Sequence, residues 1–193
     1  MLTLCTVEDA KRIRTKPVPG QRIVCVGAGV IGLEVASSAR ARGCIVDVTE
    51  AAASVMGRCV SPEMSAWVAE LHRAAGVTLH LGTAVTAIEP GRVVFGSGQE
   101  IAADCVIAGI GMERNVDLAA RTGLAIDRGI LVDEFGRTSV EGVYAAGDVA
   151  AFWVPRLAQH VRLESWKHAQ NHGIAVGRAM ADVGKPFDEV PWF

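Results

Sequence analysis

The hydrophobic pattern of residues 21–50 predicts a strand, a helix and a second strand in succession. Arg22 to Val26 is a short apolar run, as expected of a strand buried on both faces. Small and apolar residues recur at helical period from Val30 to Arg42, and a second apolar run from Cys44 to Thr49 ends at Glu50. The pattern therefore predicts a βαβ unit.

The pattern of residues 61–111 predicts a helix and then a series of strands. Ser61 before Pro62 marks a helix start, because proline is favoured at the first helical position. Met64, Trp67, Val68 and Leu71 recur at the spacing of one helix face, so we expect that face to be buried. Strands are expected at residues 77–81, 83–89, 92–95, 100–103 and 104–111, with an antiparallel pair around the turn at Pro90-Gly91.

The two ends of the chain show weaker patterns. Thr6 is placed to cap a helix from Val7 to Arg14, with Asp9 at the capping-box position. In the second half we expect a short helix over residues 115–123, short strands at 130–132 and around 143–146, and an irregular segment over 151–161. A final helix is expected over residues 167–182, capped by Ser165, with its packed side formed by Ala169, His172, Gly173, Val176 and Met180.

Composition narrows the classes of function. Half of the residues are hydrophobic, which suffices for a core. The formal net charge of −2 does not indicate binding to nucleic acid or to a membrane surface. Apolar runs are too often broken by glycine or charge to predict a transmembrane helix. Five scattered cysteines, with no C-x-x-C pair and no evident signal peptide, indicate a reducing cytoplasm.

The turn between the first strand and its helix carries the candidate chemistry. Gly27, Gly29 and Gly32 stand at G-x-G-x-x-G spacing. In a dinucleotide site the first glycine permits a tight turn, the second lets the backbone approach a pyrophosphate, and the third lets the helix lie close to the sheet. The helix N-terminus adds unpaired N–H groups and a positive dipole end. A purely structural βαβ turn is the alternative.

Glu50 indicates which dinucleotide this turn would hold. Its carboxylate stands at the tip of the second strand, where it can accept hydrogen bonds from both ribose hydroxyls. The same charge would repel a 2′-phosphate, so we expect NADH and not NADPH.

Other residues suggest further contacts. Gly109 and Gly111 end an apolar strand and would let its backbone approach a nicotinamide or ribose, although a simple turn is the alternative. Asp148 after Gly147 can bind sugar or ribityl hydroxyls, or can equally cap a following helix. His168 and His172 share a helix face, but without an acidic or cysteine partner nearby we expect no metal site.

Three stretches, taken together, resemble one family. They are GAGVIGLEVA with the terminal Glu50, DCVIAGIG, and TSVEGVYAAGDVA followed by RLESWKHAQNHGIAVGRAM. The chain resembles the FAD- and NADH-dependent ferredoxin reductases that serve Rieske-type dioxygenases and some cytochrome P450 systems, within the pyridine-nucleotide–flavoprotein superfamily. The implied fold class is α/β: a Rossmann-like NAD-binding domain with a central parallel sheet and an antiparallel β insert, plus the C-terminal portion of an FAD-binding domain.

The resemblance also implies a fragment of a longer chain. Residues 1–19 would be a connector from a missing FAD half, residues 20–115 the NAD(H)-binding domain, and residues 116–193 the returning segment of the FAD domain, cut before an interface domain. Cys5 stands where the family usually has an arginine that helps to hold FAD. With the missing half, this argues against independent FAD binding, and exposed apolar surface would favour self-association.

The family's cofactor contacts carry over to twelve positions. The NADH pyrophosphate would bind at Gly27, Gly29, Val30, Ile31 and Gly32, the adenosine ribose at Glu50, and the nicotinamide end near Ile110 and Gly111. The FAD ribityl chain and phosphate would bind at Gly147 and Asp148, the flavin ring would lie by Trp166, and Glu164 would lie near the NADH carboxamide.

In the full enzyme, the resemblance implies hydride transfer from NADH to FAD and single-electron transfer to a [2Fe–2S] ferredoxin, with no catalytic side chain. One alternative is a fragment of a pyridine-nucleotide disulfide oxidoreductase or NADH oxidase, although no C-x-x-C lies within residues 20–115. The other is a stand-alone NADH-binding module without catalysis.

Overall fold

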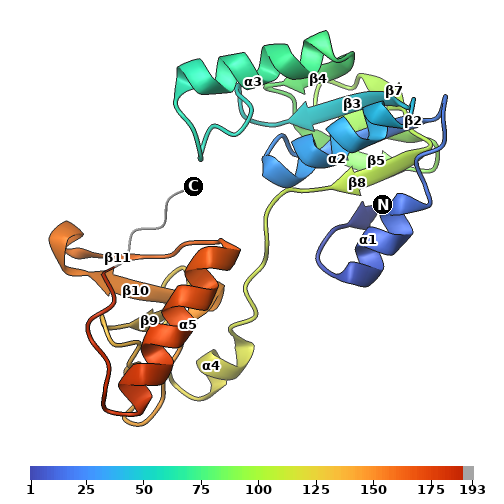
Figure 1. Ribbon diagram of the computed structural model, residues 1–193. Helices are drawn as coiled ribbons and strands as arrows, with labels where there is room; N and C mark the ends of the chain where they lie inside the picture. Colours follow the sequence, from blue (N-terminus) through green and yellow to red (C-terminus); the bar gives the residue numbers. More distant parts are fainter. Residues whose placement is uncertain (189–193) are drawn as a thin grey trace. The chain divides into compact units, whose positions relative to one another are not determined.

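The computed structural model describes residues 1–188, and the chain divides into two compact units, with the boundary between Gly111 and Met112. Figure 1 follows the chain from the first unit, in blue to green, into the second, in yellow to red. The first unit has two sheets and two apolar cores, and the second has one of each, so each unit is described by itself.

A five-stranded parallel sheet forms the centre of the first unit. Its strands lie in the order β1, β8, β2, β3, β4. The chain runs from β2 outward to β3 and β4, then returns to place β8 on the other side of β2, so the order reverses between β2 and β8. In such sheets, ligands bind beyond the carboxyl ends of the strands at this reversal. The strands are Leu2–Thr3 (β1), Arg22–Val26 (β2), Ile45–Glu50 (β3), Val77–Leu81 (β4) and Cys105–Ala108 (β8).

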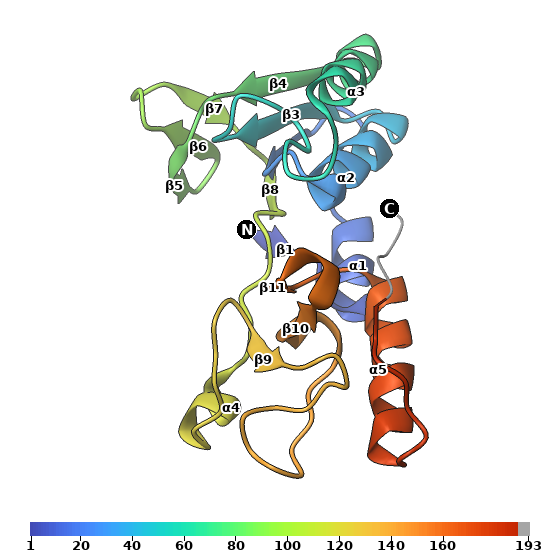
Figure 2. The same cartoon turned by 90° about the vertical axis from the view of Figure 1, so that its left-hand side faces the viewer.

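The two faces of this sheet are covered differently, as Figure 2 shows. Helices α2 (Val30–Ala41) and α3 (Pro62–Ala74) cover one face, where Leu33 and Ala69 join the core formed with Ile23. The antiparallel strands β5 (Val85–Glu89), β6 (Arg92–Phe95) and β7 (Glu100–Ala102) cover the other, with Val93 and Phe95 packed in a core that includes Val24 and Val106. Alternating residues of β2 therefore serve two separate cores.

The second unit packs a long helix against a small sheet. Strand β10 (Ala150–Val154) pairs parallel with β9 (Ile130–Val132) and antiparallel with β11 (Gln159–Val161). Helix α5 (Trp166–Met180) contributes Val176 and Ala179 to the buried residues, and Phe152 and Phe187 are buried at the core. The shorter elements are α4 (Asp117–Arg121) and the 3-10 turns η1 (Gly147–Val149) and η2 (Pro155–Leu157).

The capping signals were confirmed. Thr6 caps α1 (Val7–Arg14), and Asp9 completes the capping box by accepting from the Thr6 amide. The Ser61 side chain accepts from the amide of Met64, and the Ser165 side chain accepts from the amide of His168. Each side chain satisfies a helix N–H that has no partner within the helix.

Two expectations for the second half were wrong. The segment 143–146 is not a regular strand: it forms one isolated bridge, between Arg137 and Tyr144, flanked by backbone hydrogen bonds from Thr138 to Val143 and from Ala145 to Gly136. The segment 151–161, expected to be irregular, is the hairpin of β10 and β11 joined by η2. Proline and bulky aromatic residues obscured its period, but Pro155 stands in the turn, where it removes no ladder bond.

The buried faces of two helices were also predicted wrongly in part. Met64, Trp67 and Leu71 of α3 are 47%, 61% and 52% exposed, while Ser65 and Ala69 make the buried face. In α5, Met180 is exposed and so is Gly173, whereas His172 and Val176 are buried as expected. Small residues fit where a helix lies close to a sheet, and apolar periodicity alone does not reveal them. A two-residue strand, β1, was missed altogether.

The α/β fold class is confirmed, with its central parallel sheet and its antiparallel insert between β4 and β8. No helix within residues 1–188 has the length and apolar character needed to cross a membrane.

Candidate functional site

A cavity of about 620 Å³ opens at the carboxyl ends of the central strands in the first unit. The residues that follow β2, β3, β4 and β8 all contribute to it, so it lies where the strand order of a parallel sheet reverses. Its lining consists of Val26, Gly27, Ala28, Gly29, Thr49, Glu50, Ala51, Ala52, Ser54, Met56, Gly57, Arg58, Cys59, Thr83, Ala84, Val85, Gly109 and Ile110.

Two of the three glycines allow close backbone packing below this cavity. Gly27 has φ +100°, and a Cβ there would lie 2.5 Å from the carbonyl oxygen of Gly109. A Cβ on Gly32 would lie 1.9 Å from the carbonyl oxygen of Gly27. Any side chain at either position would therefore force the strand β2, the strand β8 and the helix α2 apart.

Gly29 differs from the other two because the space beside it is open. A Cβ built there would meet nothing within 4 Å, although its φ of −79° is accessible to any residue. Gly29 is also the N-cap of α2, and no side chain caps this helix. The first N–H groups of α2, which follow at Val30 and Ile31, therefore remain available to an anion beside a backbone without a Cβ.

Glu50 is held in place by backbone amides of two loops. Its Oε2 accepts from the amide of Ala28 at 2.8 Å, and its Oε1 accepts from the amide of Ala52 at 2.9 Å. Each carboxylate oxygen can accept a further hydrogen bond. The group thus presents a fixed negative charge beside the glycine turn.

Ile110 and Gly111 follow β8 and end the first unit. Ile110 lines the cavity and its side chain is 72% exposed. Gly111 has φ +107° and nothing within 4 Å of its missing Cβ. The backbone after β8 is therefore open to a ligand at both residues.

The other four predicted site residues lie in the second unit. Gly147 has φ +76°, and its Cβ position is 3.5 Å from the Cβ of Ala169 in α5. The Oδ1 atom of Asp148 is buried and has no hydrogen-bond partner among the described residues. Glu164 precedes the N-cap of α5, and Trp166 is the first residue of this helix, with its side chain 81% exposed.

One arginine joins two of these residues. The Nη1 atom of Arg162 donates to the backbone carbonyl of Asp148 at 3.2 Å and to Oε1 of Glu164 at 2.5 Å. Sequence reasoning did not identify Arg162 or the lining residue Arg58, and it placed His172 on the packed side of its helix without a role at the site. No sequence signal pointed to the Arg162–Asp148 contact, because it joins residues 14 apart across the hairpin of β10 and β11, which was not predicted.

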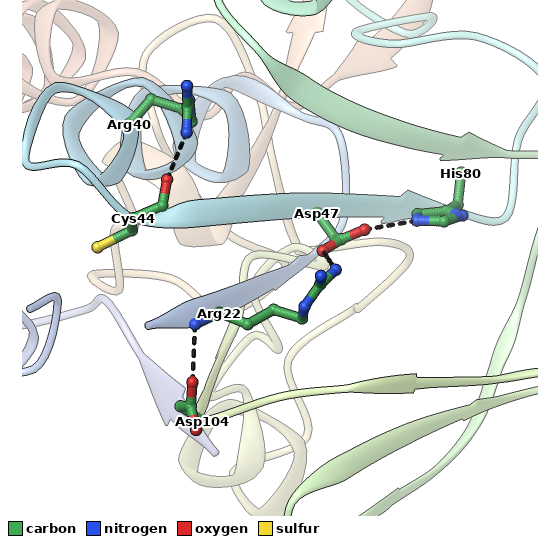
Figure 3. A network of polar contacts seen from close by, with 6 residues as sticks. All are labelled: Arg22, Arg40, Cys44, Asp47, His80 and Asp104. Atoms are coloured by element: carbon green, nitrogen blue, oxygen red, sulfur yellow. Dashed lines mark hydrogen bonds and ion pairs between the residues drawn. The ribbon is translucent and has the colours of Figure 1, made fainter. Parts of the chain in front are cut away.

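A network of polar contacts surrounds the buried Asp47 in the parallel sheet (Figure 3). Asp47 of β3 accepts from Arg22 of β2 at 2.7 Å and pairs with Nε2 of His80 of β4 at 2.9 Å. The Asp47 side chain is 3% exposed, and none of the three residues lines the cavity. The network joins three neighbouring strands and has a structural role. Within residues 1–188, no group of three or more potential metal ligands occurs.

Comparison with known proteins gives several matches. The family model described as pyridine nucleotide-disulphide oxidoreductase matches residues 2–173. The ferredoxin–NAD(+) reductase component of the anthranilate 1,2-dioxygenase system of Burkholderia cepacia is 37% identical over 191 residues, which cover 97% of this chain and 47% of that protein. Rhodocoxin reductase of Rhodococcus erythropolis is 40% identical over 195 residues, covering 98% of this chain and 46% of that protein.

A solved structure gives the same result. The covalent putidaredoxin reductase–putidaredoxin complex contains a chain that matches with a TM-score of 0.93 and 37% identity, covering 99% of this chain and 48% of that one. The chain spans about half the length of the curated relatives it matches. The resemblance to ferredoxin reductases is confirmed, and the chain belongs to the pyridine nucleotide-disulphide oxidoreductase family.

Proposed function

We propose that the chain is the NADH-binding portion of a flavoprotein reductase that passes hydride from NADH to FAD and electrons to a [2Fe–2S] ferredoxin. The observation that carries this proposal is the cavity at the strand ends, with the open Gly29, the uncapped start of α2 and the fixed carboxylate of Glu50 around one space. These are the parts that a dinucleotide site requires.

In this proposal each group in the cavity has a separate role. The amides of Gly29, Val30 and Ile31 receive the pyrophosphate at the positive end of α2, and Gly32 keeps the helix close beneath them. Glu50 accepts hydrogen bonds from the two hydroxyls of the adenosine ribose. Ile110 and Gly111 contact the nicotinamide end.

The second unit would contribute to an FAD site. The buried Oδ1 of Asp148 without a partner fits a ligand that donates hydroxyl groups, and the positive φ of Gly147 fits a close approach. Gly147 and Asp148 would hold the ribityl chain and phosphate, and Trp166 would lie by the ring. When bound, FAD supplies the acceptor for hydride and releases electrons one at a time. Because the cofactors carry this chemistry, we assign the protein's side chains to binding and orientation, with Glu164 near the NADH carboxamide.

We also propose how the chain is organised and where it acts. Residues 1–19 would be a connector, residues 20–115 the NAD(H)-binding domain and residues 116–193 part of the FAD-binding domain. The cytoplasm would be the compartment, which is supported by five free cysteines, of which Cys25 and Cys44 are buried. Relatives named as ferredoxin–NAD(+) reductase and as the partner of putidaredoxin support a ferredoxin as acceptor.

Disulfide reduction is a second candidate, since the family model carries that description. It needs a pair of neighbouring cysteines, and residues 20–115 contain no C-x-x-C. A stand-alone NADH-binding module remains the third candidate. A visible absorption spectrum of the protein with FAD and NADH separates the third candidate from the first two, because only a flavoprotein is bleached when NADH reduces it.

The test of the dinucleotide site is a comparison of NADH with NADPH by titration calorimetry. We expect the wild-type chain to bind NADH at least tenfold more tightly, about 1.4 kcal/mol. Glu50→Ala removes the ribose contacts and the charge that repels a 2′-phosphate. We therefore expect this variant to bind NADH more weakly and to show a smaller difference between its affinities for NADH and NADPH. Glu70→Ala, which removes an exposed carboxylate of α3, is the control and should change neither affinity.

Equal affinities of the wild-type chain for both dinucleotides would contradict the role of Glu50. A lack of saturable binding by either one would contradict the dinucleotide site itself.

A further inference from the structure

The turn η1, which carries Asp148, is held by a side chain of α5 and by one from the segment between β11 and α5. The amide of Gly147 donates to Nδ1 of His172 in α5 at 3.3 Å. The carbonyl of Asp148 accepts from Arg162 at 3.2 Å. The first contact holds the backbone on the N-terminal side of Asp148, and the second holds the backbone on its C-terminal side. The carboxylate itself takes part in neither contact.

His172 is enclosed by aromatic rings. It is fully buried, stacks on Phe187 with ring centroids 4.7 Å apart, and tilts against Phe152 and His168 at 5.2 Å each. The ionisable group in contact with it is His168 on its own helix, and Asp148 follows the Gly147 that bonds to it. None of the ion pairs of residues 1–188 includes His172.

The contact with Gly147 defines the state of the imidazole. A ring nitrogen that accepts from an amide cannot carry a proton, so Nδ1 is bare and Nε2 carries the proton of the neutral ring. Burial, and secondarily the neighbouring His168, lower the pKa of His172 from 6.5 to about 4. The neutral form therefore dominates at pH 7, as the hydrogen bond requires.

We propose that His172 is a positioning residue: as a neutral imidazole protonated at Nε2, it fixes the Gly147 amide and so orients the Asp148 carboxylate toward the hydroxyl groups of the flavin cofactor. Arg162 holds the same turn from its other side. The inference rests on the proposed function, since it takes the ligand of Asp148 to be FAD. Protonation of Nδ1 would replace an acceptor with a donor that faces the Gly147 N–H, and would release the turn.

The first test needs no substitution and no cofactor. Long-range ¹H–¹⁵N NMR spectra of the labelled chain report the tautomer and charge of each histidine. We expect His172 to be neutral, with its proton on Nε2, from pH 7 down to pH 5. A proton on Nδ1, or a charged ring at pH 6, would overturn the proposal whatever the chain binds.

The second test uses two variants that divide the roles of the side chain. His172→Phe keeps an aromatic ring but loses the acceptor, whereas His172→Asn loses the ring but keeps an acceptor at the δ position. We expect hydrogen exchange of the Gly147 amide to accelerate at least tenfold in His172→Phe and to stay closer to wild type in His172→Asn. The reverse order, or equal exchange in His172→Phe and wild type, would overturn the proposal.

The third measurement separates this inference from the proposed function. FAD is titrated into each protein and its fluorescence is followed, with Glu141→Ala as a surface control. If the wild type binds FAD, its affinity should fall at least tenfold in His172→Phe and less in His172→Asn; an unchanged affinity in His172→Phe would refute the link to the cofactor. If the wild type binds no FAD, the part of the proposal that names FAD fails for this chain, and the NMR results still decide the state of His172 and its hold on the turn.

Discussion

The three glycines of the turn after β2 have different surroundings, and these surroundings assign their roles. Gly27 and Gly32 have no room for a Cβ, whereas Gly29 faces open space. The first two are therefore required by the fold, and the third by a ligand. Alanine substitutions can separate these two requirements.

We predict opposite results for two glycine substitutions. Gly32→Ala places a Cβ 1.9 Å from the Gly27 carbonyl oxygen, so it should lower the free energy of unfolding by about 3 kcal/mol or more. Gly29→Ala should leave that free energy within about 0.5 kcal/mol but weaken NADH binding at least tenfold. Urea unfolding and calorimetry measure both. Stable Gly32→Ala, or normal NADH binding by Gly29→Ala, would contradict these roles.

The ion pair at Asp47 gives a prediction for stability. Asp47→Asn leaves Arg22 and His80 beside a neutral group in a largely buried place, which should cost about 2–4 kcal/mol of unfolding free energy. Glu70→Gln breaks the exposed pair with Arg73 and should cost less than about 1 kcal/mol. Equal losses in the two variants would mean that burial does not strengthen the Asp47 network.

His172 gives a prediction for pH dependence. Its pKa in the folded chain, about 4, lies below the ordinary value of 6.5, so folding favours the neutral ring. The resulting stability is fully present above pH 6.5 and is lost as the pH falls toward 4, up to about 3 kcal/mol. His172→Asn lacks this contribution, so the stability difference between the two proteins should shrink over this range. A difference that is constant from pH 7 to pH 4 would contradict the lowered pKa.

The residues around the glycine turn could be predicted from the sequence because they belong to one regular βαβ unit. Gly27, Gly29 and Gly32 lie in its turn and Glu50 ends its second strand, so the strand–helix–strand pattern brings them together although Ala28 and Glu50 are 22 residues apart. The contacts of Gly147 with His172 and of Asp148 with Arg162 span 25 and 14 residues. They depend on how α5 and β11 fold back on η1, which no local pattern encodes.

At the scale of elements, the regular parallel strands were predictable and the second unit was less so. Strands β2, β3 and β8 are apolar runs bounded by glycine or charge, and Thr6, Ser61 and Ser165 gave clear helix starts. The hairpin of β10 and β11 was missed because its apolar and polar residues, including Phe152 and Trp153, do not alternate with the period of two that predicts a strand. The segment 143–146 was predicted as a strand from its apolar run, but its pairing with residues 136–138 is limited to one isolated bridge.

Helix α3 gives a prediction about its own exposed face. Because Trp67 is 61% exposed, Trp67→Ser should change the free energy of unfolding by no more than about 0.5 kcal/mol. Ala69 is buried against the sheet, so Ala69→Leu should cost about 1–3 kcal/mol through overpacking. The sequence pattern alone would give the opposite order. A larger loss in Trp67→Ser than in Ala69→Leu would support that pattern against the structure.

At the scale of the whole molecule, large apolar side chains are exposed on both units. Met64, Trp67 and Leu71 form a stripe on α3, and Trp166 and Met112 are exposed in the second unit. Because these apolar side chains are exposed, we predict that the chain self-associates through such surfaces. In light scattering, the apparent mass should rise with protein concentration. The rise should be smaller for Trp67→Ser. A monomer at every concentration would contradict this prediction.

The central claim is that the turn after β2 receives a diphosphate while Glu50 selects an unphosphorylated ribose. The most direct test is an NMR titration of the ¹⁵N-labelled chain with NADH, followed at the backbone amides. We predict saturable shifts of the amides of Ala28, Gly29, Val30 and Ile31, with much smaller shifts when NADPH is added at the same concentration. Shifts confined to other parts of the chain, or identical shifts with both dinucleotides, would contradict the account.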